Sequence, residues 1–408
     1  MTALWRSYVL GVGLLVTLCF LYVCMKGNVC QSKAKPKMHQ VCYYAIPNKG
    51  SGDITVKALS VDDIDPFICT HILVAFARIR DKVIVPSKDG DIEVYKEVIA
   101  LKEKNPELKV LLSVGGGSTD GGFPSLVRDP EAVVKFASHT QKFLTSFGFD
   151  GLDLDWEFPA WPALLRNRQE KRWFTRLVQH LHQEFKSPSQ KPLLLTIAVA
   201  APKAIIDRSY EISELSKYVD FVSMMGYDYH IFWPYLPFTG YNAPLFKSKK
   251  DKYYFATMNI QWSADYWVKK GMPREKLVIG IPTYGRTWKL LNESWNQTGS
   301  PAVGKGMLSG VVSYPEACIF YKEGAKRHFD ETCKVPYAVR ERDWVSYDDP
   351  QSIGEKVKWA KANSFAGVMT WNLNCDDWAG ICSGEKFELH GVIKKVISRD
   401  EQGLNHIP

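Results

Sequence analysis

The sequence lacks the features that would mark a fibrous, disordered or nucleic-acid-binding protein. Its 408 residues contain no repeat of solenoid period and no low-complexity segment. The formal net charge is +8, but the basic residues are scattered, and the densest run, Lys247–Lys252, predicts a solvated face and not a nucleic-acid surface. No histidine cluster accompanies the acidic residues, so we expect neither a metal nor another cofactor.

The composition is that of a globular protein with a large core. Hydrophobic residues make up 46% and charged residues 24% of the chain, and the length fits one barrel with an insertion. The 13 tryptophans favour a well-packed aromatic core, with a carbohydrate-stacking cleft as the alternative.

Only one long hydrophobic run is present, at the amino terminus. Residues Ser7 to Met25 carry no charge and are long enough to span a bilayer. We therefore predict a signal-anchor over residues 1–26 and a stem over 27–38, with a cleaved signal peptide as the alternative. The lysines after this run would by the positive-inside rule place the rest of the chain in the cytoplasm.

Glycosylation signals and cysteines indicate the opposite side of the membrane. Asn292-Glu-Ser and Asn296-Gln-Thr are both N-glycosylation acceptors. Beyond the stem lie six cysteines, an even number that fits three disulfides: Cys42, Cys69, Cys318, Cys333, Cys375 and Cys382. We expect a lumenal or extracellular domain, either on a type II membrane protein or secreted after cleavage.

Short apolar runs alternate with amphipathic stretches from residue 39 to residue 400. Eight runs read as strands: Val41–Tyr44, Ile72–Phe76, Val110–Val114, Leu152–Trp156, Leu193–Ala200, Val219–Met225, Leu277–Ile281 and Gly367–Trp371. Helices are predicted between them, for example from Asp129-Pro130, an N-cap followed by proline at the first helical position. This alternation predicts an α/β protein with a (β/α)8 barrel.

One connection is too long for a loop. Residues 287–349, between the seventh and eighth strands, are expected to form a small α+β insertion before the seventh helix. Residues 401–408 are expected to be a tail.

Three acidic side chains share one face of the fourth strand. Because strand residues alternate between faces, Asp153, Asp155 and Glu157 point one way, and Leu152, Leu154 and Trp156 the other. Carboxylates buried together raise at least one pKa, which a general acid requires near neutral pH. A solvated acidic turn and a divalent-metal site are the alternatives, but neither matches this alternation or spacing.

The motif Asp150-Gly-Leu-Asp153-Leu-Asp155-Trp-Glu157 resembles the signature of the chitinases of glycoside hydrolase family 18, of the vertebrate acidic chitinase and chitotriosidase type. Further matching motifs are Cys69–Phe76, Ser113-Val-Gly-Gly116, Met225-Gly-Tyr227-Asp228, Gly280–Arg286 and Gly367–Trp371. The resemblance covers about residues 38 to 399.

The resemblance implies a substrate-assisted, retaining hydrolysis of N-acetylglucosamine polymers such as chitin. Glu157 would protonate the leaving oxygen, Asp155 would orient the acetamido group, Asp153 would share a proton with Asp155, and Tyr227 would hydrogen-bond the acetamido oxygen. The substrate-binding residues would be Tyr43, Phe76, Gly115, Gly116, Met225, Asp228, Trp233, Tyr284, Arg286 and Trp371. Core packing is the alternative for the aromatic residues and for Met225, and an ion pair at the barrel rim for Arg286.

The resemblance also implies disulfides Cys42–Cys69 and Cys318–Cys382, with Cys333 and Cys375 left for a third. Two tryptophans expected in the family are replaced by Tyr44-Ala-Ile-Pro47 and by Gly117, which favours oligosaccharides over crystalline chitin. The retained Glu157 predicts an active, monomeric hydrolase. A tethered chitinase-like lectin that binds N-acetylglucosamine glycans without turnover is the alternative.

Overall fold

The computed structural model describes residues 37–47, 58–117, 120–188 and 191–399. The predicted signal-anchor, nearly all of the stem and the tail lie outside these ranges. Within them, no helix combines the length and the apolar character that a membrane crossing needs.

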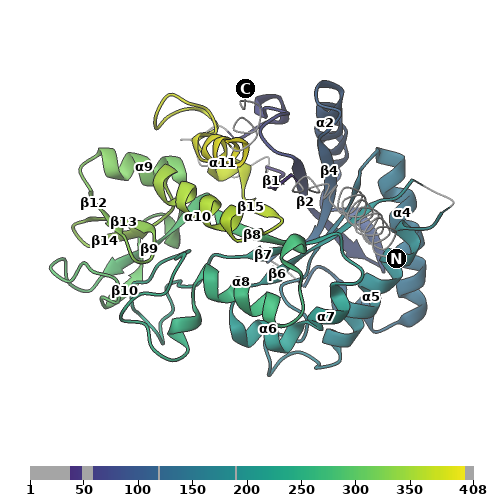
Figure 1. The fold of residues 1–408 in the computed structure, drawn as a ribbon, viewed down its shortest axis with the longest axis horizontal. Helices are drawn as coiled ribbons and strands as arrows, with labels where there is room; N and C mark the ends of the chain where they lie inside the picture. The colour runs from purple at the N-terminus through teal and green to yellow at the C-terminus, as the bar shows by residue number, and fades with distance from the viewer. Residues whose placement is uncertain (1–36, 48–57, 118–119, 189–190, 400–408) are drawn as a thin grey trace, which may run out of the picture. The chain divides into compact units, whose positions relative to one another are not determined.

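Eight parallel strands close a barrel (Figure 1). They are β1 (His39–Ala45), β2 (His71–Arg80), β4 (Lys109–Gly115), β5 (Gly151–Asp155), β6 (Leu194–Ala200), β7 (Phe221–Met225), β8 (Leu277–Pro282) and β15 (Gly367–Trp371). β1 pairs with both β2 and β15, so these eight strands leave no open edge. The antiparallel β3 (Val83–Pro86) extends β2. The predicted barrel and its eight strands are confirmed.

Helices flank the barrel strands. They are α2 (Asp91–Lys104), α3 (Phe123–Val127), α4 (Pro130–Phe147), α5 (Glu170–Phe185), α6 (Lys203–Ser209), α7 (Ile212–Leu215), α8 (Ile260–Lys269), α10 (Pro350–Ala362) and α11 (Glu388–Ser398). Single 3-10 turns lie at Val61–Asp63, Phe255–Thr257, Arg274–Lys276, Met307–Gly310 and Leu373–Cys375. α4 begins as predicted, since the Asp129 carboxylate caps the backbone N–H groups of Glu131 and Ala132.

The insertion is a separate antiparallel sheet with one helix. It comprises β9 (Tyr284–Leu290), β10 (Ala302–Lys305), β11 (Val311–Ser313), α9 (Tyr314–Lys322), β12 (Lys326–Asp330), β13 (Val335–Arg340) and β14 (Asp343–Ser346). The strand order is β10-β9-β14-β13-β12, and β11 pairs with β9. It begins at Tyr284 and not at the expected Thr287, because a single residue, Thr283, separates β8 from β9.

The described residues contain two disulfides, Cys42–Cys69 and Cys318–Cys382, as the resemblance implied. The expectation of a third is wrong: Cys333 and Cys375 are free thiols. Cys333 is packed in a core of the insertion, whereas Cys375 packs against the barrel core. Burial raises the pKa of the Cys375 thiol to about 12 and also raises the pKa of Cys333.

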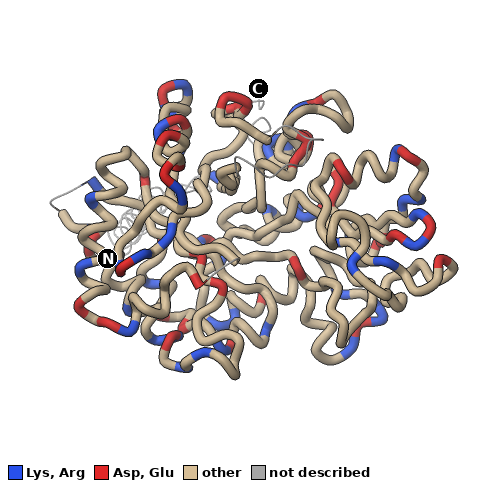
Figure 2. Tube along the Cα trace, turned by 180° about the vertical axis from the view of Figure 1, so that it is seen from behind, with Lys and Arg blue, Asp and Glu red and all other residues tan. Residues whose placement is uncertain are grey.

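Charges of both signs are interspersed along the chain. In Figure 2, Lys and Arg alternate with Asp and Glu over most of the visible elements and form no single basic stripe. This distribution agrees with the scattered basic residues of the sequence.

Candidate active site

The acidic residues of β5 run from the middle of the strand, at Asp153, to its carboxyl end, at Asp155. Asp153 is in register with Ser113 on β4 and with Thr196 on β6. On the opposite face Leu152, Leu154 and Trp156 are buried, and the indole of Trp156 stacks on Phe123 at 5.2 Å. The predicted division of the strand into an acidic and an apolar face is therefore observed.

Asp153 is fully buried, and both of its carboxylate oxygens accept hydrogen bonds. Its Oδ2 accepts hydrogen bonds of 2.7 Å from the hydroxyls of Tyr43 and Ser113, and its Oδ1 accepts one of 2.7 Å from Thr196. Burial raises the pKa of Asp153, and these three hydrogen bonds oppose the rise. The surrounding hydroxyls thus stabilise a negative charge at the bottom of the site.

Asp155 is buried without such support. Its Oδ1 has no hydrogen-bond partner among the described residues. Burial and, after it, the carboxylates of Glu157 and Asp153 hold the pKa of Asp155 well above its ordinary value. The free oxygen is an acceptor that a ligand N–H could satisfy.

Glu157 follows the end of β5 by two residues. Burial, together with the negative charge of Asp228, raises the pKa of Glu157 to about 7. A carboxyl group with this pKa is protonated in part at neutral pH, as general-acid catalysis requires.

Asp228 is held in place by the first strand of the insertion. Its carboxylate accepts a 2.8 Å hydrogen bond from the Tyr284 hydroxyl and two of 2.7 Å from the Arg286 guanidinium. Its backbone N–H donates to Oδ1 of Asn242 at 3.0 Å. The bidentate pair fixes the orientation of Asp228. Arg286 therefore forms an ion pair with Asp228, and its role in substrate binding stays a prediction.

Aromatic rings border the acidic face. Trp371 stacks on Phe76 with ring centroids 5.4 Å apart and lies 5.3 Å from Tyr43. The Tyr227 hydroxyl lies 4.0 Å from Sδ of Met369, and burial raises the pKa of this phenol well above its ordinary value. Tyr227 therefore remains a neutral donor.

Tyr43 has a different position from the one expected. It was predicted to line the cleft, but only 1% of the residue is exposed and its hydroxyl is used by Asp153. Tyr43 is thus a positioning residue for Asp153 and not a wall of the cleft.

Three consecutive glycines, Gly115 at the end of β4 and the two residues after it, allow the backbone to approach the site closely. A Cβ on Gly115 would lie 2.1 Å from the carbonyl oxygen of Asp155, and one on Gly116 would lie 2.5 Å from the ring of Phe76. Both glycines have positive φ angles. A Cβ on Gly117 would lie 3.0 Å and 3.2 Å from the two carboxylate oxygens of Glu157.

For two predicted substrate-binding residues, Trp233 and Met225, the structure gives no contact with the acidic residues of β5 among the described residues. Trp233, in the loop after β7, is 54% exposed, and its ring neighbour is Tyr235 at 5.9 Å. Met225 is buried at the end of β7 and belongs to the barrel core.

Three partners of the acidic residues were not predicted from the sequence: Ser113, which was named only as part of a motif, Thr196 and Asn242. Ser113 and Thr196 interrupt the apolar strands β4 and β6, and this polar interruption was the available signal. Asn242 also donates from Nδ2 to the Tyr284 carbonyl at 3.2 Å. It lies in a loop, where no periodicity could reveal it.

One group of three potential metal-ligand atoms occurs in the described part of the chain, at Cys42, Cys69 and His390. The two sulfurs are joined in the disulfide. His390 instead uses its ring nitrogens to pair with Asp376 and Thr370.

A family model for glycosyl hydrolases family 18 matches residues 39–376. The chain belongs to this family. This family 18 chain is 35% identical to chitinase-3-like protein 2 of Homo sapiens over 348 residues, covering 82% of this chain and 86% of that protein. It is 37% identical to chitotriosidase-1 of Mus musculus, and the match covers 82% of this chain and 73% of that protein.

Solved structures of family 18 proteins share the fold. Human YKL-39, described as a pseudo-chitinase with retained chitooligosaccharide binding, matches with a TM-score of 0.82 at 34% identity, covering 88% of this chain and 100% of that one. The Ostrinia furnacalis Group IV chitinase in complex with allosamidin matches with a TM-score of 0.81 at 34% identity, covering 89% and 99%. The relatives therefore include both chitinases and a pseudo-chitinase.

Proposed function

We propose that this family 18 protein hydrolyses β-1,4 linkages between N-acetylglucosamine units of chitin or chitooligosaccharides. The observation that carries the proposal is Glu157, whose pKa is raised to about 7 at the mouth of the barrel. Beside it Asp155 keeps a buried oxygen without a partner among the described residues. A proton donor and a free acceptor thus lie next to each other, as the reaction requires.

In the first step, Glu157 gives its proton to the glycosidic oxygen as the bond to the anomeric carbon breaks. The carbonyl oxygen of the substrate's own acetamido group attacks that carbon and forms an oxazolinium ion. The acetamido N–H donates to Asp155, and the Tyr227 hydroxyl donates to the acetamido oxygen. Trp371 and Phe76 would support the distorted sugar.

In the second step, the Glu157 carboxylate takes a proton from a water molecule, which attacks the anomeric carbon from the face that the leaving group occupied. The ring of the oxazolinium ion opens and the product retains its configuration. Asp153 and Asp155 share a proton through the cycle, and the three hydroxyls around Asp153 favour the charge on that side of the pair.

A non-catalytic lectin is the second candidate. Human YKL-39 is described as binding chitooligosaccharides as a pseudo-chitinase. In the present chain Gly117 provides no side chain for a sugar to stack on. The retained Glu157 favours hydrolysis over this alternative.

The two candidates differ in turnover. Wild type and E157Q, with D343N as a control for a carboxylate remote from the site, would be incubated with N-acetylglucosamine oligomers of two to six units. We expect wild type and D343N to release products with retained anomeric configuration, and E157Q to bind the oligomers without cleaving them. Binding by the wild type without turnover would establish the lectin, and cleavage by E157Q would contradict the role of Glu157.

We further propose a monomer whose catalytic domain lies in the secretory lumen or outside the cell. The two disulfides support this location, since such bonds persist in oxidising compartments. Whether residues 1–26 anchor the chain as a type II membrane protein or are removed can be decided by sequencing the amino terminus of the mature protein. Alkaline carbonate extraction of membranes would test the anchor independently.

A further inference from the structure

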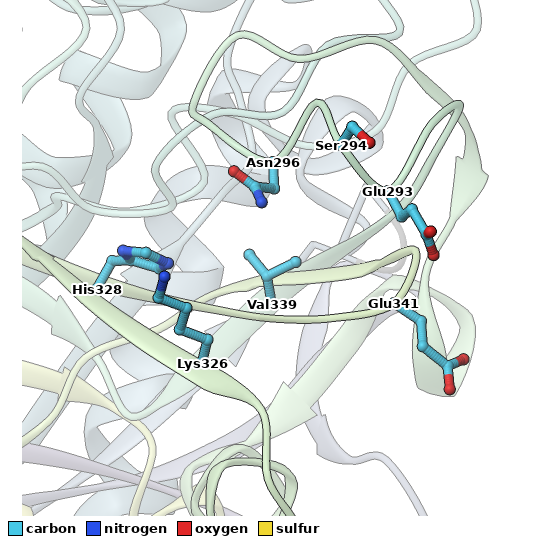
Figure 3. A pocket seen from close by; sticks show the side chains of 7 residues that line it. All are labelled: Glu293, Ser294, Asn296, Lys326, His328, Val339 and Glu341. Carbon is cyan, nitrogen blue, oxygen red and sulfur yellow. The ribbon is translucent and has the colours of Figure 1, made fainter.

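The insertion carries a pocket away from the acidic face of β5. Its volume is about 430 Å³, and it is lined by Glu293, Ser294, Asn296, Lys326, His328, Val339 and Glu341 (Figure 3). Nothing in the proposed hydrolysis uses this pocket. One of its lining residues, Asn296, is the acceptor of the second glycosylation signal.

The floor of the pocket is one face of the hairpin β12–β13. Lys326 is paired in register with Val339, and His328 with Tyr337. Val339, which is 7% exposed, is the one apolar side chain among the residues that line the pocket. In Figure 3, Lys326 and His328 lie on one side of Val339, whereas Glu293 and Glu341 lie on the other.

The loop that bears Asn296 crosses above this floor and is attached to the core of the insertion. The indole N–H of Trp344 donates to the carbonyl oxygen of Asn296 at 3.1 Å. Trp344 is fully buried and stacks on Tyr337, which stacks on His328. The hydrogen bond from Trp344 therefore fixes the position of the Asn296 backbone relative to the hairpin. In Figure 3 the side-chain amide of Asn296 lies on the side of its loop that faces Val339.

The pocket has the chemistry of a small sugar site. Val339 can contact the carbon face of a hexosamine ring, and the polar side chains around it suit the hydroxyls and the N-acetyl group. Neither the Lys326 ammonium nor the His328 ring forms a hydrogen bond to another described residue, so both can bind a ligand. A sugar joined covalently to Asn296 would be present at high effective concentration, and a shallow pocket would suffice to hold it.

The first glycosylation signal provides an internal comparison. Asn292 is exposed and does not line the pocket. Its side-chain oxygen accepts a 2.9 Å hydrogen bond from the backbone N–H of Ser294. A glycan on Asn292 would project into solvent, although it lies only four positions before Asn296.

We propose that Asn296 is N-glycosylated and that its first N-acetylglucosamine occupies the pocket between Lys326, His328 and Glu341, fastening the loop 292–298 to the hairpin β12–β13. In the transfer, the amide nitrogen of Asn296 forms a bond to the anomeric carbon of the sugar. The bond from that carbon to a lipid diphosphate carrier breaks, the carrier leaves as the diphosphate, and the amide loses one proton. The donor is a lipid diphosphate-linked oligosaccharide of the secretory lumen. This inference does not depend on catalysis by Glu157.

The test uses the full chain expressed in a eukaryotic secretory host. Peptide mapping by mass spectrometry would establish which asparagines are modified. T298A removes the second signal but leaves Asn296 in place, and T298S keeps the signal. N292D removes the first signal but keeps the side-chain oxygen that accepts the hydrogen bond from Ser294. We expect T298A to lower the Tm by about 2 °C relative to T298S, and N292D to leave the Tm unchanged.

A second arm uses the wild-type protein and needs no variant. An endoglycosidase that leaves a single N-acetylglucosamine on each asparagine should leave the Tm and the hydrogen-exchange protection of β12–β13 unchanged, because that sugar alone fills the pocket. An unmodified Asn296, equal Tm values for T298A and T298S, or a loss of protection in the trimmed protein would each overturn the proposal.

Discussion

The hydroxyl of Tyr43 on β1 donates a 2.7 Å hydrogen bond to Oδ2 of Asp153 on β5, joining residues 110 positions apart. Ser113 donates to the same oxygen, and Thr196 to the other. The carboxylate that lies deepest in the site is therefore held by three different strands of the barrel, β1, β4 and β6.

Y43F should destabilise the carboxylate form of Asp153. The hydrogen bond from Tyr43 opposes the rise in the pKa of Asp153 that burial causes, so its loss should raise that pKa further. A hydrogen bond to a charged group contributes about 1.5–3 kcal/mol, so we expect kcat/KM to fall at least about tenfold. The acid limb of the pH profile should move to higher pH. The neighbouring Y44F, whose hydroxyl bonds to the Leu59 carbonyl, serves as the control, and equal profiles for the two variants would contradict this role.

D228N should change the alkaline limb of the pH profile. The negative charge of Asp228 helps to raise the pKa of Glu157 to about 7, so a neutral asparagine should lower that pKa. Because the acid form of Glu157 is the active one, kcat/KM should then decline at a lower pH than in wild type. D343N, which breaks the 3.1 Å pair with Lys289 on the insertion, should leave the profile unchanged. If the alkaline limb of D228N lies at the same pH as that of wild type, the charge of Asp228 does not raise the pKa of Glu157.

E157Q should be more stable than wild type at alkaline pH. The pKa of Glu157 rises from 4.5 to about 7 on folding, so the folded state binds more protons between these values. Stability from the wild-type residue is present below pH 4.5 and is lost as the pH rises through 7. Denaturant unfolding at pH 8 should therefore favour E157Q by about 3 kcal/mol, with little difference at pH 4.5. An exposed glutamate on α4, Glu131, gives the control E131Q, and a difference that does not vary with pH would refute this linkage.

G117A should impair turnover without disturbing the fold. The new Cβ would lie 3.0 Å from one oxygen of Glu157, so the carboxyl group must move. Because small displacements of a catalytic group are costly, we expect kcat to fall about tenfold to a hundredfold. Gly90, at the start of α2, has nothing within 4 Å of its Cβ position, and G90A should keep full activity. Equal kcat values for G117A and wild type would show that Glu157 has room on this side.

Much of the barrel could be predicted because its signals are local. Each strand is a short apolar run, and the alternation along β5 alone placed Asp153 and Glu157 on one face. Tyr43 and Tyr44 show where this reasoning ends. Both are buried, since β1 is covered on both faces, and the sequence does not reveal which ring points to Asp153.

The partners of Asp228 and the fate of the cysteines depend on pairing over long distances. Asn242 contacts Asp228 and Tyr284 because of the path of its loop, and a loop has no regular residue pattern from which this contact could be predicted. Cys333 and Cys375 supplied an even count, but they are packed in separate cores, one in the insertion and one on the barrel. The number of cysteines in a sequence does not show whether two of them lie close enough in the fold to form a disulfide.

The insertion begins with Tyr284 and Arg286, which are also the residues that hold Asp228. A chain trimmed to a minimal eight-stranded barrel would keep Glu157 but would leave the neighbouring carboxylate without its counter-charge. Local unfolding of the antiparallel sheet should thus be transmitted to the proton affinity of the catalytic acid. We therefore expect that replacing the insertion by that of a relative changes the pKa of Glu157, because the first strand of the insertion holds Asp228, whose charge raises that pKa.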